Sequence, residues 1–161
     1  MRYKMREKIW SLRDRYAIRT PDDEERFVIE GKLLSIGKKL TFSSTDGDEL
    51  ARIEQKVMAL RPTYFVQRSG QPTARVRRML MPLFRSRYVL EVPGQKDVEA
   101  HGNVWAHEYE LKRGSRSIGS VSKKLFSWSD SYGIELDDDE DQVLLLCATV
   151  IIDLVCHEGQ K

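Results

Sequence analysis

Apolar and polar residues alternate along several short segments of the chain. The alternation is clearest in residues 51–57, 86–92 and 105–111. Because successive side chains of a strand point to opposite faces, this pattern predicts half-buried β-strands. The residues expected to face the interior are Ala51, Ile53, Val57, Tyr88, Leu90, Val92, Trp105, His107, Tyr109 and Leu111.

Turn-forming residues separate the predicted strands at short intervals. They lie at residues 45–48, 61–62, 93–94 and 113–115 and include glycine or proline in every case. These residue types favour tight connections between strands. Many short strands joined in this way indicate a β-sandwich or a β-barrel.

Residues 31–66 and 102–136 resemble each other weakly. Each segment starts with glycine, passes a glycine-containing turn, and continues through a strand that ends in lysine to a Tyr-x-aliphatic sequence. A duplication would imply two similar half-sheets. The sequence features common to all hairpins explain the match equally well, so both interpretations stay open.

The C-terminal part of the chain has a different pattern. Residues 143–155 are apolar except for Thr149 and Asp153. As a helix this run is about 20 Å long, too short for a bilayer core of about 30 Å. A helix that is apolar on all sides in a soluble protein is surrounded by protein. The sequence therefore predicts a closed antiparallel barrel that encloses a C-terminal helix over residues 139–157.

The helix is expected to start within the acidic run 137–141. Asp138 or Asp139 can act as the N-cap, and carboxylates complement the positive end of the helix dipole. Asp139 and Gln142 also have the spacing of a capping box. Asp153 is expected near a barrel mouth or paired with a basic or hydroxyl group.

The length of the chain indicates the number of domains, and the distribution of charge indicates the character of its surface. With 161 residues and 18.7 kDa, a single domain over residues 1–161 is expected. The net charge of +2 says little, but residues 52–87 hold nine basic residues and one acidic residue, whereas residues 135–161 hold eight acidic residues and one lysine. This asymmetry predicts a basic face and an acidic end, although a solvated surface can give the same count.

The two cysteines and the N-terminal residues indicate the cellular compartment of the protein. Cys147 and Cys156 are nine positions apart, so on a helix they point to opposite sides and cannot pair. Their apolar surroundings predict that both are buried. Residues 1–12 are charged and lack the apolar core of a signal peptide. A reduced, cytoplasmic protein without a transmembrane segment is therefore expected.

Several motifs follow one another along the chain. They are EKIWSL at 7–12, YAI at 16–18, VIEGKLLSIGKKL at 28–40, DGDEL at 46–50, IEQK at 53–56 and RPTY at 61–64. This series resembles the LURP-one-related proteins, most closely the short bacterial members.

The resemblance implies the tubby C-terminal-like fold. In that mainly β fold about twelve antiparallel strands form a closed barrel of two similar halves around a hydrophobic C-terminal α-helix. Relatives with this fold include tubby domains, which resemble phosphoinositide-binding membrane tethers, and phospholipid scramblases, which are membrane-associated and calcium-responsive. No catalytic residues are agreed for the family, so none is transferred to this chain.

The residues themselves give no positive support for catalysis. His101, His107 and His157 lie on different predicted elements without metal-ligand spacing, and His107 is expected to be a hydrogen-bonded histidine inside the barrel. The chain has no Gly-x-Ser-x-Gly, P-loop or dinucleotide-binding motif. A protein without enzymatic activity and without a cofactor is expected.

The acidic run 137–141 also suggests a calcium site. Its alternate carboxylates match the start of an EF-hand loop, but the glycine position falls at Gln142 and the final glutamate position at Ala148. The EF-hand interpretation therefore fails. A weak calcium site of another kind remains as the alternative to a helix start in a solvated loop.

The basic stretch 73–87 is the strongest candidate for a binding site. Arg75, Arg77 and Arg87 are expected on one outward strand face, with Arg78 and Arg85 nearby. The apolar residues 79–84 are expected either to insert into a membrane interface or to pack as core and loop. Basic pairs in the two similar segments complete the candidate site, which comprises Lys38, Lys39, Arg75, Arg77, Arg78, Lys123 and Lys124.

The expected function follows from this basic set. Each basic residue near an anionic membrane contributes about 1 kcal/mol of attraction. We therefore expect a binding or regulatory module for anionic phospholipid headgroups, peripheral at the membrane surface. The same basic residues are also typical of a barrel exterior that keeps the protein soluble and protects strand edges. The alternative function is a protein-interaction scaffold; scramblase-like lipid handling and nucleic-acid binding have less support, since no recognition helix is visible.

Overall fold

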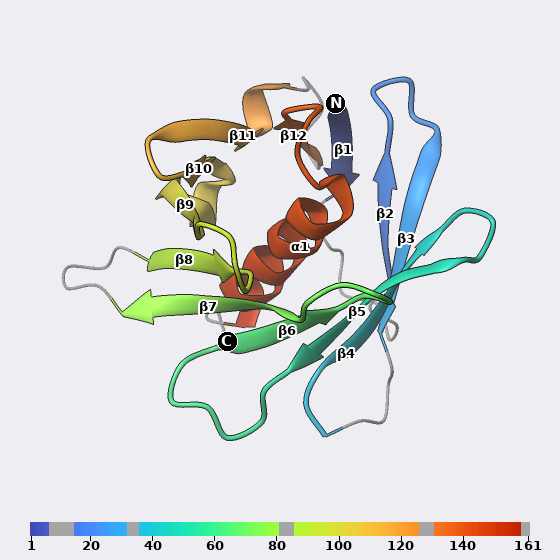
Figure 1. Cartoon of the computed structure of the whole chain (residues 1–161). Coiled ribbons are helices and arrows are strands. Elements are labelled where there is room, and N and C mark those ends of the chain that lie inside the picture. The colour runs from blue at the N-terminus through green and yellow to red at the C-terminus, as the bar shows by residue number, and fades with distance from the viewer. Residues whose placement is uncertain (7–14, 32–35, 81–85, 126–130, 159–161) are drawn as a thin grey trace.

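The computed structural model describes residues 1–6, 15–31, 36–80, 86–125 and 131–158. Within them, twelve antiparallel strands form a closed barrel, with α1 lying inside the ring (Figure 1). The strands are β1 (Arg2–Arg6), β2 (Arg15–Arg19), β3 (Glu25–Gly31), β4 (Lys39–Ser44), β5 (Glu49–Gln55), β6 (Thr63–Gln67), β7 (Ala74–Leu80), β8 (Ser86–Glu91), β9 (Val98–Asn103), β10 (Glu108–Arg113), β11 (Arg116–Ser122) and β12 (Ser131–Leu136).

Each strand pairs with its neighbours in sequence, and the pairing of β1 with β12 closes the barrel. Met5 lies opposite Tyr132 in this closing pair. The N-terminal ammonium of Met1 strengthens the seam by donating to the carbonyl of Leu136 at 2.7 Å. Closure removes the exposed strand edges that would otherwise pair with other chains.

The C-terminal helix α1 (Gln142–Glu158) fills the barrel, as the apolar run predicts. Every residue from Leu144 to Cys156 is buried. The six tyrosines of the chain also lie inside, where their rings fill the space between the helix and the barrel wall. They are Tyr3, Tyr16, Tyr64, Tyr88, Tyr109 and Tyr132.

The predicted cap of this helix was wrong by two to three residues. Asp141 is the N-cap, because its Oδ1 accepts a hydrogen bond from the backbone N–H of Leu144 at 3.1 Å. The side chain of Gln142 donates to the carbonyls of Asp137 and Glu140, so it does not complete a capping box with Asp139. Arg116 binds the Asp139 carboxylate outside the helix.

Two of the three predicted strands are confirmed, with one error. In β8, Tyr88 and Leu90 are buried as expected, and Val92 beyond its end is buried too. In β5, Ala51 and Ile53 face the interior, but Val57 is 47% exposed because the strand ends at Gln55. The alternation in the sequence continues past the point where the pairing stops.

The third predicted strand starts later than its pattern suggests. Residues Val104–Ala106 form the short 3₁₀ helix η1, and His107 adopts a left-handed conformation with φ 53°. The Asn103 side chain accepts from the N–H of Ala106 and stabilises this turn. The strand β10 therefore begins at Glu108, although the expected burial of His107, Tyr109 and Leu111 is confirmed.

The two similar sequence segments fall on corresponding parts of the barrel. The first contributes β4, β5 and β6, and the second contributes β10, β11 and β12, six strands further along. The matching tyrosines Tyr64 and Tyr132 are both completely buried. This placement favours two similar halves over a chance likeness between hairpins.

Candidate functional site

The alternating strand directions give the barrel two distinct ends. Connections that follow even-numbered strands lie at the end where α1 begins, and connections that follow odd-numbered strands lie at the other. We call the first the acidic end: residues 20–24, 45–48, 68–73, 92–97, 114–115 and 137–141. We call the second the basic end: residues 36–38, 56–62, 104–107, 123–125 and the C-terminus of α1.

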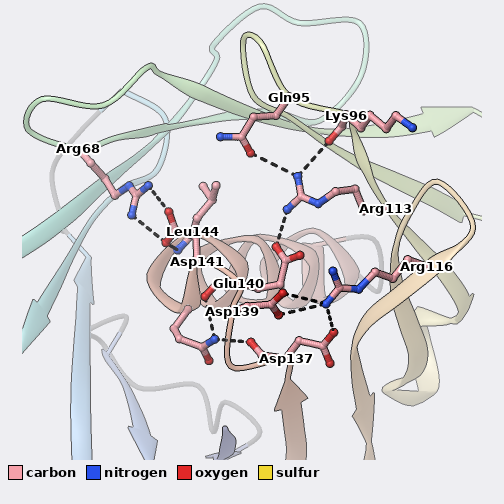
Figure 2. A network of polar contacts seen from close by, with 11 residues as sticks. Arg68, Gln95, Lys96, Arg113, Arg116, Asp137, Asp139, Glu140, Asp141 and Leu144 are labelled. Atoms are coloured by element: carbon pink, nitrogen blue, oxygen red, sulfur yellow. Dashed lines mark hydrogen bonds and ion pairs between the residues drawn. The ribbon is translucent and has the colours of Figure 1, made fainter.

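Arginines from the β6–β7 and β10–β11 hairpins bind the acidic run of the acidic end (Figure 2). Arg113 contacts Glu140 at 2.6 Å, Arg68 binds Asp141 with both terminal nitrogens, and Arg116 binds Asp137 at 2.8 Å and Asp139 at 3.1 Å. The hydrogen bond from Arg116 holds the pKa of Asp139 below its usual value.

This network gives the acidic run a structural role. It ties the loop before α1 to the ends of β6, β10 and β11. Among the residues that the structure describes, no three His, Cys, Asp or Glu side chains are grouped to hold a metal ion. The carboxylates of Asp137, Asp139 and Asp141, which the sequence suggested as calcium ligands, instead accept hydrogen bonds from arginine guanidinium groups.

Arg75 and Arg77 share an outward face, as predicted, but they are already paired. Both donate to Glu91 on the neighbouring strand, at 2.6 and 2.7 Å. Burial opposes the charge of Glu91, yet the hydrogen bonds from the two arginines hold its pKa below the usual range. This part of the wall is therefore partly neutralised.

Arg78 lies on the opposite face of β7 from Arg75 and Arg77. It is paired in register with the buried Tyr88 and lies 6.0 Å from the ring of Trp105. Its Nε has no hydrogen-bond partner within the described chain. The predicted arginine cluster is thus divided between the two faces of the wall. Residues 81–85, which include Arg85 and most of the apolar stretch beside it, lie outside the described residues.

The predicted lysines gather at the basic end. Lys123 and Lys124 are exposed on the short 3₁₀ helix η2 (Lys123–Leu125). Lys38 lies 3.1 Å from Glu158 at the end of α1, and Lys39 lies 4.0 Å from Glu54. The fold therefore brings both lysine pairs to one end of the barrel, away from Arg75.

The sequence reading missed further residues of this end. Lys56 and Arg61 lie in the β5–β6 connection, and the same end exposes most of the large apolar side chains found on the described surface. With their exposed fractions these are Ile36 83%, Val57 47%, Met58 98%, Leu60 103% and Leu125 37%. Strand alternation alone cannot reveal them, because they lie where the pairing stops.

Two connections of the basic end are in contact with each other. The backbone N–H of Gln55 donates to the carbonyl of Lys38 at 2.8 Å, and the Gln55 side chain accepts from the N–H of Lys38 at 3.0 Å. A Cβ at Gly37 would lie 2.8 Å from Cγ2 of Val57, so glycine permits this close approach. The exposed apolar residues of the two connections thus lie on neighbouring segments of the basic end.

A buried polar cluster lies inside the barrel near the basic end. His107 donates from Nε2 to Oδ1 of Asp153 at 2.8 Å and stacks on Tyr132 with ring centroids 4.2 Å apart. His157 donates to the Asp153 carbonyl at 2.8 Å. The expectation that Asp153 pairs with a basic group is confirmed, and the fold joins two histidines that the sequence had assigned to separate elements.

The His107–Asp153 pair of this cluster is shielded from solvent. His107 is 6% exposed and Asp153 is 2% exposed.

The two cysteines of α1 are also buried. Burial raises the pKa of the Cys147 thiol far above its usual value and that of Cys156 to about 11. Both thiols therefore stay protonated near neutral pH and are poor nucleophiles.

The described chain contains no helix long and apolar enough to cross a bilayer. Its architecture defines a class of proteins in which an antiparallel barrel closes around its own C-terminal helix. The protein belongs to the LURP-one-related family, whose model matches residues 1–153. It is 30% identical over 156 residues to the uncharacterized protein YxjI of Bacillus subtilis (strain 168), covering 97% of this chain and 94% of that protein.

Proposed function

We propose that the protein is a binding or regulatory module without catalytic activity that attaches to anionic phospholipid headgroups through its basic end. The separation of charge along the barrel axis carries this proposal. Of the described connecting residues at the basic end, five are basic and Glu158 alone is acidic. The basic residues are Lys38, Lys56, Arg61, Lys123 and Lys124.

The opposite end has the reverse charge. Besides the acidic run 137–141, its turns carry Asp22, Asp23, Glu24, Asp46, Asp48 and Asp97. An anionic surface attracts the basic end and repels the acidic end. The attraction and the repulsion therefore favour the same orientation, with the basic end of the barrel toward the membrane. At about 1 kcal/mol for each basic residue near the surface, the attraction amounts to a few kcal/mol.

The proposal gives less weight to the arginines of the wall. Arg75 and Arg77 share the Glu91 carboxylate, so an anion there would compete with an existing ion pair. Lys56, Arg61, Lys123 and Lys124 carry the headgroup contact. Lys38 and Lys39 lie nearby, each facing a glutamate. The resemblance of the family to membrane-associated tubby and scramblase domains supports the same class of ligand.

A protein-interaction scaffold is the second candidate function. Exposed apolar side chains such as Met58 and Leu60 also occur on surfaces that bind proteins. This function predicts no affinity for vesicles of any lipid composition.

Liposome co-sedimentation tests the proposal. The protein is expected to pellet with phosphatidylserine-containing vesicles and not with phosphatidylcholine vesicles, and less at high salt because the charges are screened. The double variant Lys123→Ala/Lys124→Ala should bind about 30-fold more weakly, since two contributions of about 1 kcal/mol are lost.

The matched control is Lys96→Ala/Lys112→Ala, which removes the same charge from the acidic end and the outer wall. It should bind like the unaltered protein. If no protein pellets with anionic vesicles even at low salt, the lipid function is wrong and the scaffold function takes its place.

A further inference from the structure

Four exposed apolar side chains lie on two touching connections of the basic end. Met58 and Leu60 are fully exposed, and Ile36 and Val57 lie in the same two touching connections. Single exposed apolar residues are common on protein surfaces, but a cluster of them marks an interaction surface. The residues belong to two segments that the barrel brings together.

The backbone of the β5–β6 connection is fixed at its base. The N–H of Lys56 donates to the carbonyl of Thr63 at 2.8 Å, and the N–H of Arg78 donates to the carbonyl of Pro62 at 3.1 Å. The Thr63 hydroxyl donates to the carbonyl of Arg61 at 3.0 Å. The connection is therefore held at both ends while its middle residues project from the barrel.

Met58 has an unusual conformation for its residue type. Its φ is 62°, in the left-handed region that favours glycine, and its side chain is 98% exposed. No burial of this side chain within the barrel compensates for the backbone conformation. Outlying backbone conformations of this kind are concentrated at functional sites.

Basic residues flank residues 57–60, which we call the apolar tip. Lys56 and Arg61 lie on either side of residues 57–60, and Lys38 and Lys39 follow Ile36 in the neighbouring connection. Long basic side chains reach toward the headgroups while adjacent apolar residues enter the bilayer. An apolar tip between cationic side chains thus has the polarity profile of an anionic membrane interface.

Resting on the proposed function, we infer that the β5–β6 connection inserts into the bilayer. Met58 and Leu60 enter the acyl-chain region of an anionic membrane, with Ile36 and Val57 at its border. Lys56 and Arg61 contact the headgroups above. The basic charges give selectivity for anionic lipid, and the apolar tip gives a contribution to binding that does not depend on salt.

Site-specific fluorescence tests the insertion. Cys147 and Cys156 are 0% and 4% exposed, so a cysteine introduced by Met58→Cys can be labelled selectively with the environment-sensitive dye NBD in the folded protein. On anionic vesicles the emission should increase and shift to shorter wavelength, and acyl-chain doxyl lipids should quench it. The same label at Gln71→Cys, in the exposed β6–β7 turn of the acidic end, is the matched control and should not respond.

A second variant separates insertion from headgroup attraction. Met58→Ser/Leu60→Ser removes two side chains that make little contact with the barrel, so the melting temperature should not change. Its affinity for anionic vesicles should fall by about 100-fold or more while the dependence on salt persists.

The outcomes distinguish the two proposals. If the protein pellets with anionic vesicles but the label at position 58 stays in water, headgroup binding stands and insertion is wrong. If no vesicle binds the protein, both are wrong, and the apolar tip belongs to a protein interface.

Discussion

His107 and Asp153 are joined by a 2.8 Å hydrogen bond inside the barrel, although they are 46 positions apart in the sequence. The contact links the connection before β10 to the second half of α1. It explains how a carboxylate is accommodated in an apolar helix, since a buried charge is tolerated when it is paired and hydrogen-bonded. The lone charged position of the apolar run is thus an attachment point between the helix and the barrel wall.

Removing the histidine should destabilise the protein strongly. His107→Ala leaves the Asp153 carboxylate buried without this partner, and the free energy of unfolding is expected to fall by about 3–5 kcal/mol. Asp153→Asn should cost less, because it removes the charge and keeps a hydrogen-bonding side chain. Urea denaturation followed by circular dichroism measures both. His101→Ala, on the exposed outer surface, is the control, and equal small losses for His101→Ala and His107→Ala would contradict the role of the pair.

The Glu91 carboxylate should contribute to the pH dependence of stability. Its folded-state pKa is held below the ordinary value of 4.5 by Arg75 and Arg77, against the effect of burial. The folded state therefore binds this proton less readily than the unfolded state, so the stabilisation is present above about pH 4.5 and is lost as the pH falls through the folded-state value.

Unfolding experiments at several pH values can isolate this contribution. Glu91→Gln should be less stable than the unaltered protein at pH 7, and the difference should shrink below about pH 4.5. Glu24→Gln, in the exposed β2–β3 turn, is the control without an arginine pair of this kind. A difference for Glu91→Gln that stays constant across this range would show that the ion pairs do not respond to protonation.

The N-cap of α1 can be located by comparing neighbouring aspartates. Asp141→Ala should cost about 1–2 kcal/mol, because the N–H of Leu144 loses its acceptor and Arg68 loses its carboxylate. Asp139→Ala removes only exposed contacts to Arg116 and should have a smaller effect. Thermal denaturation measures both variants, and a larger loss for Asp139→Ala would move the cap back to the position first expected.

The sequence predicts the fold more completely than the candidate site, and the residues show why. Barrel and helix follow from local periodicity and from the length of the apolar run. Asp141 is fixed by Arg68 from the β6–β7 turn, and its neighbours are held by Arg113 and Arg116 from the β10–β11 hairpin, so the acidic run alone is ambiguous. Likewise, the pairing of Arg75 with Glu91 and the contact of Gly37 with Val57 exist only after strands pair, and residues 57–60 lie where periodicity ends.

The hydrophobic pattern predicts the burial of Val150 correctly and that of Val57 wrongly, and one matched pair of substitutions tests both outcomes. Val150 is completely buried on α1, so Val150→Asp should cost more than about 3 kcal/mol because it places an uncompensated charge inside the barrel. Val57 is 47% exposed in the β5–β6 connection, so Val57→Asp should change stability by less than about 1 kcal/mol. Chemical denaturation of the two variants compares the same chemical change at two valines. An unchanged stability for Val150→Asp would contradict the enclosed helix, and a large loss for Val57→Asp would show that the alternation of residues 51–57 continues into the core after all.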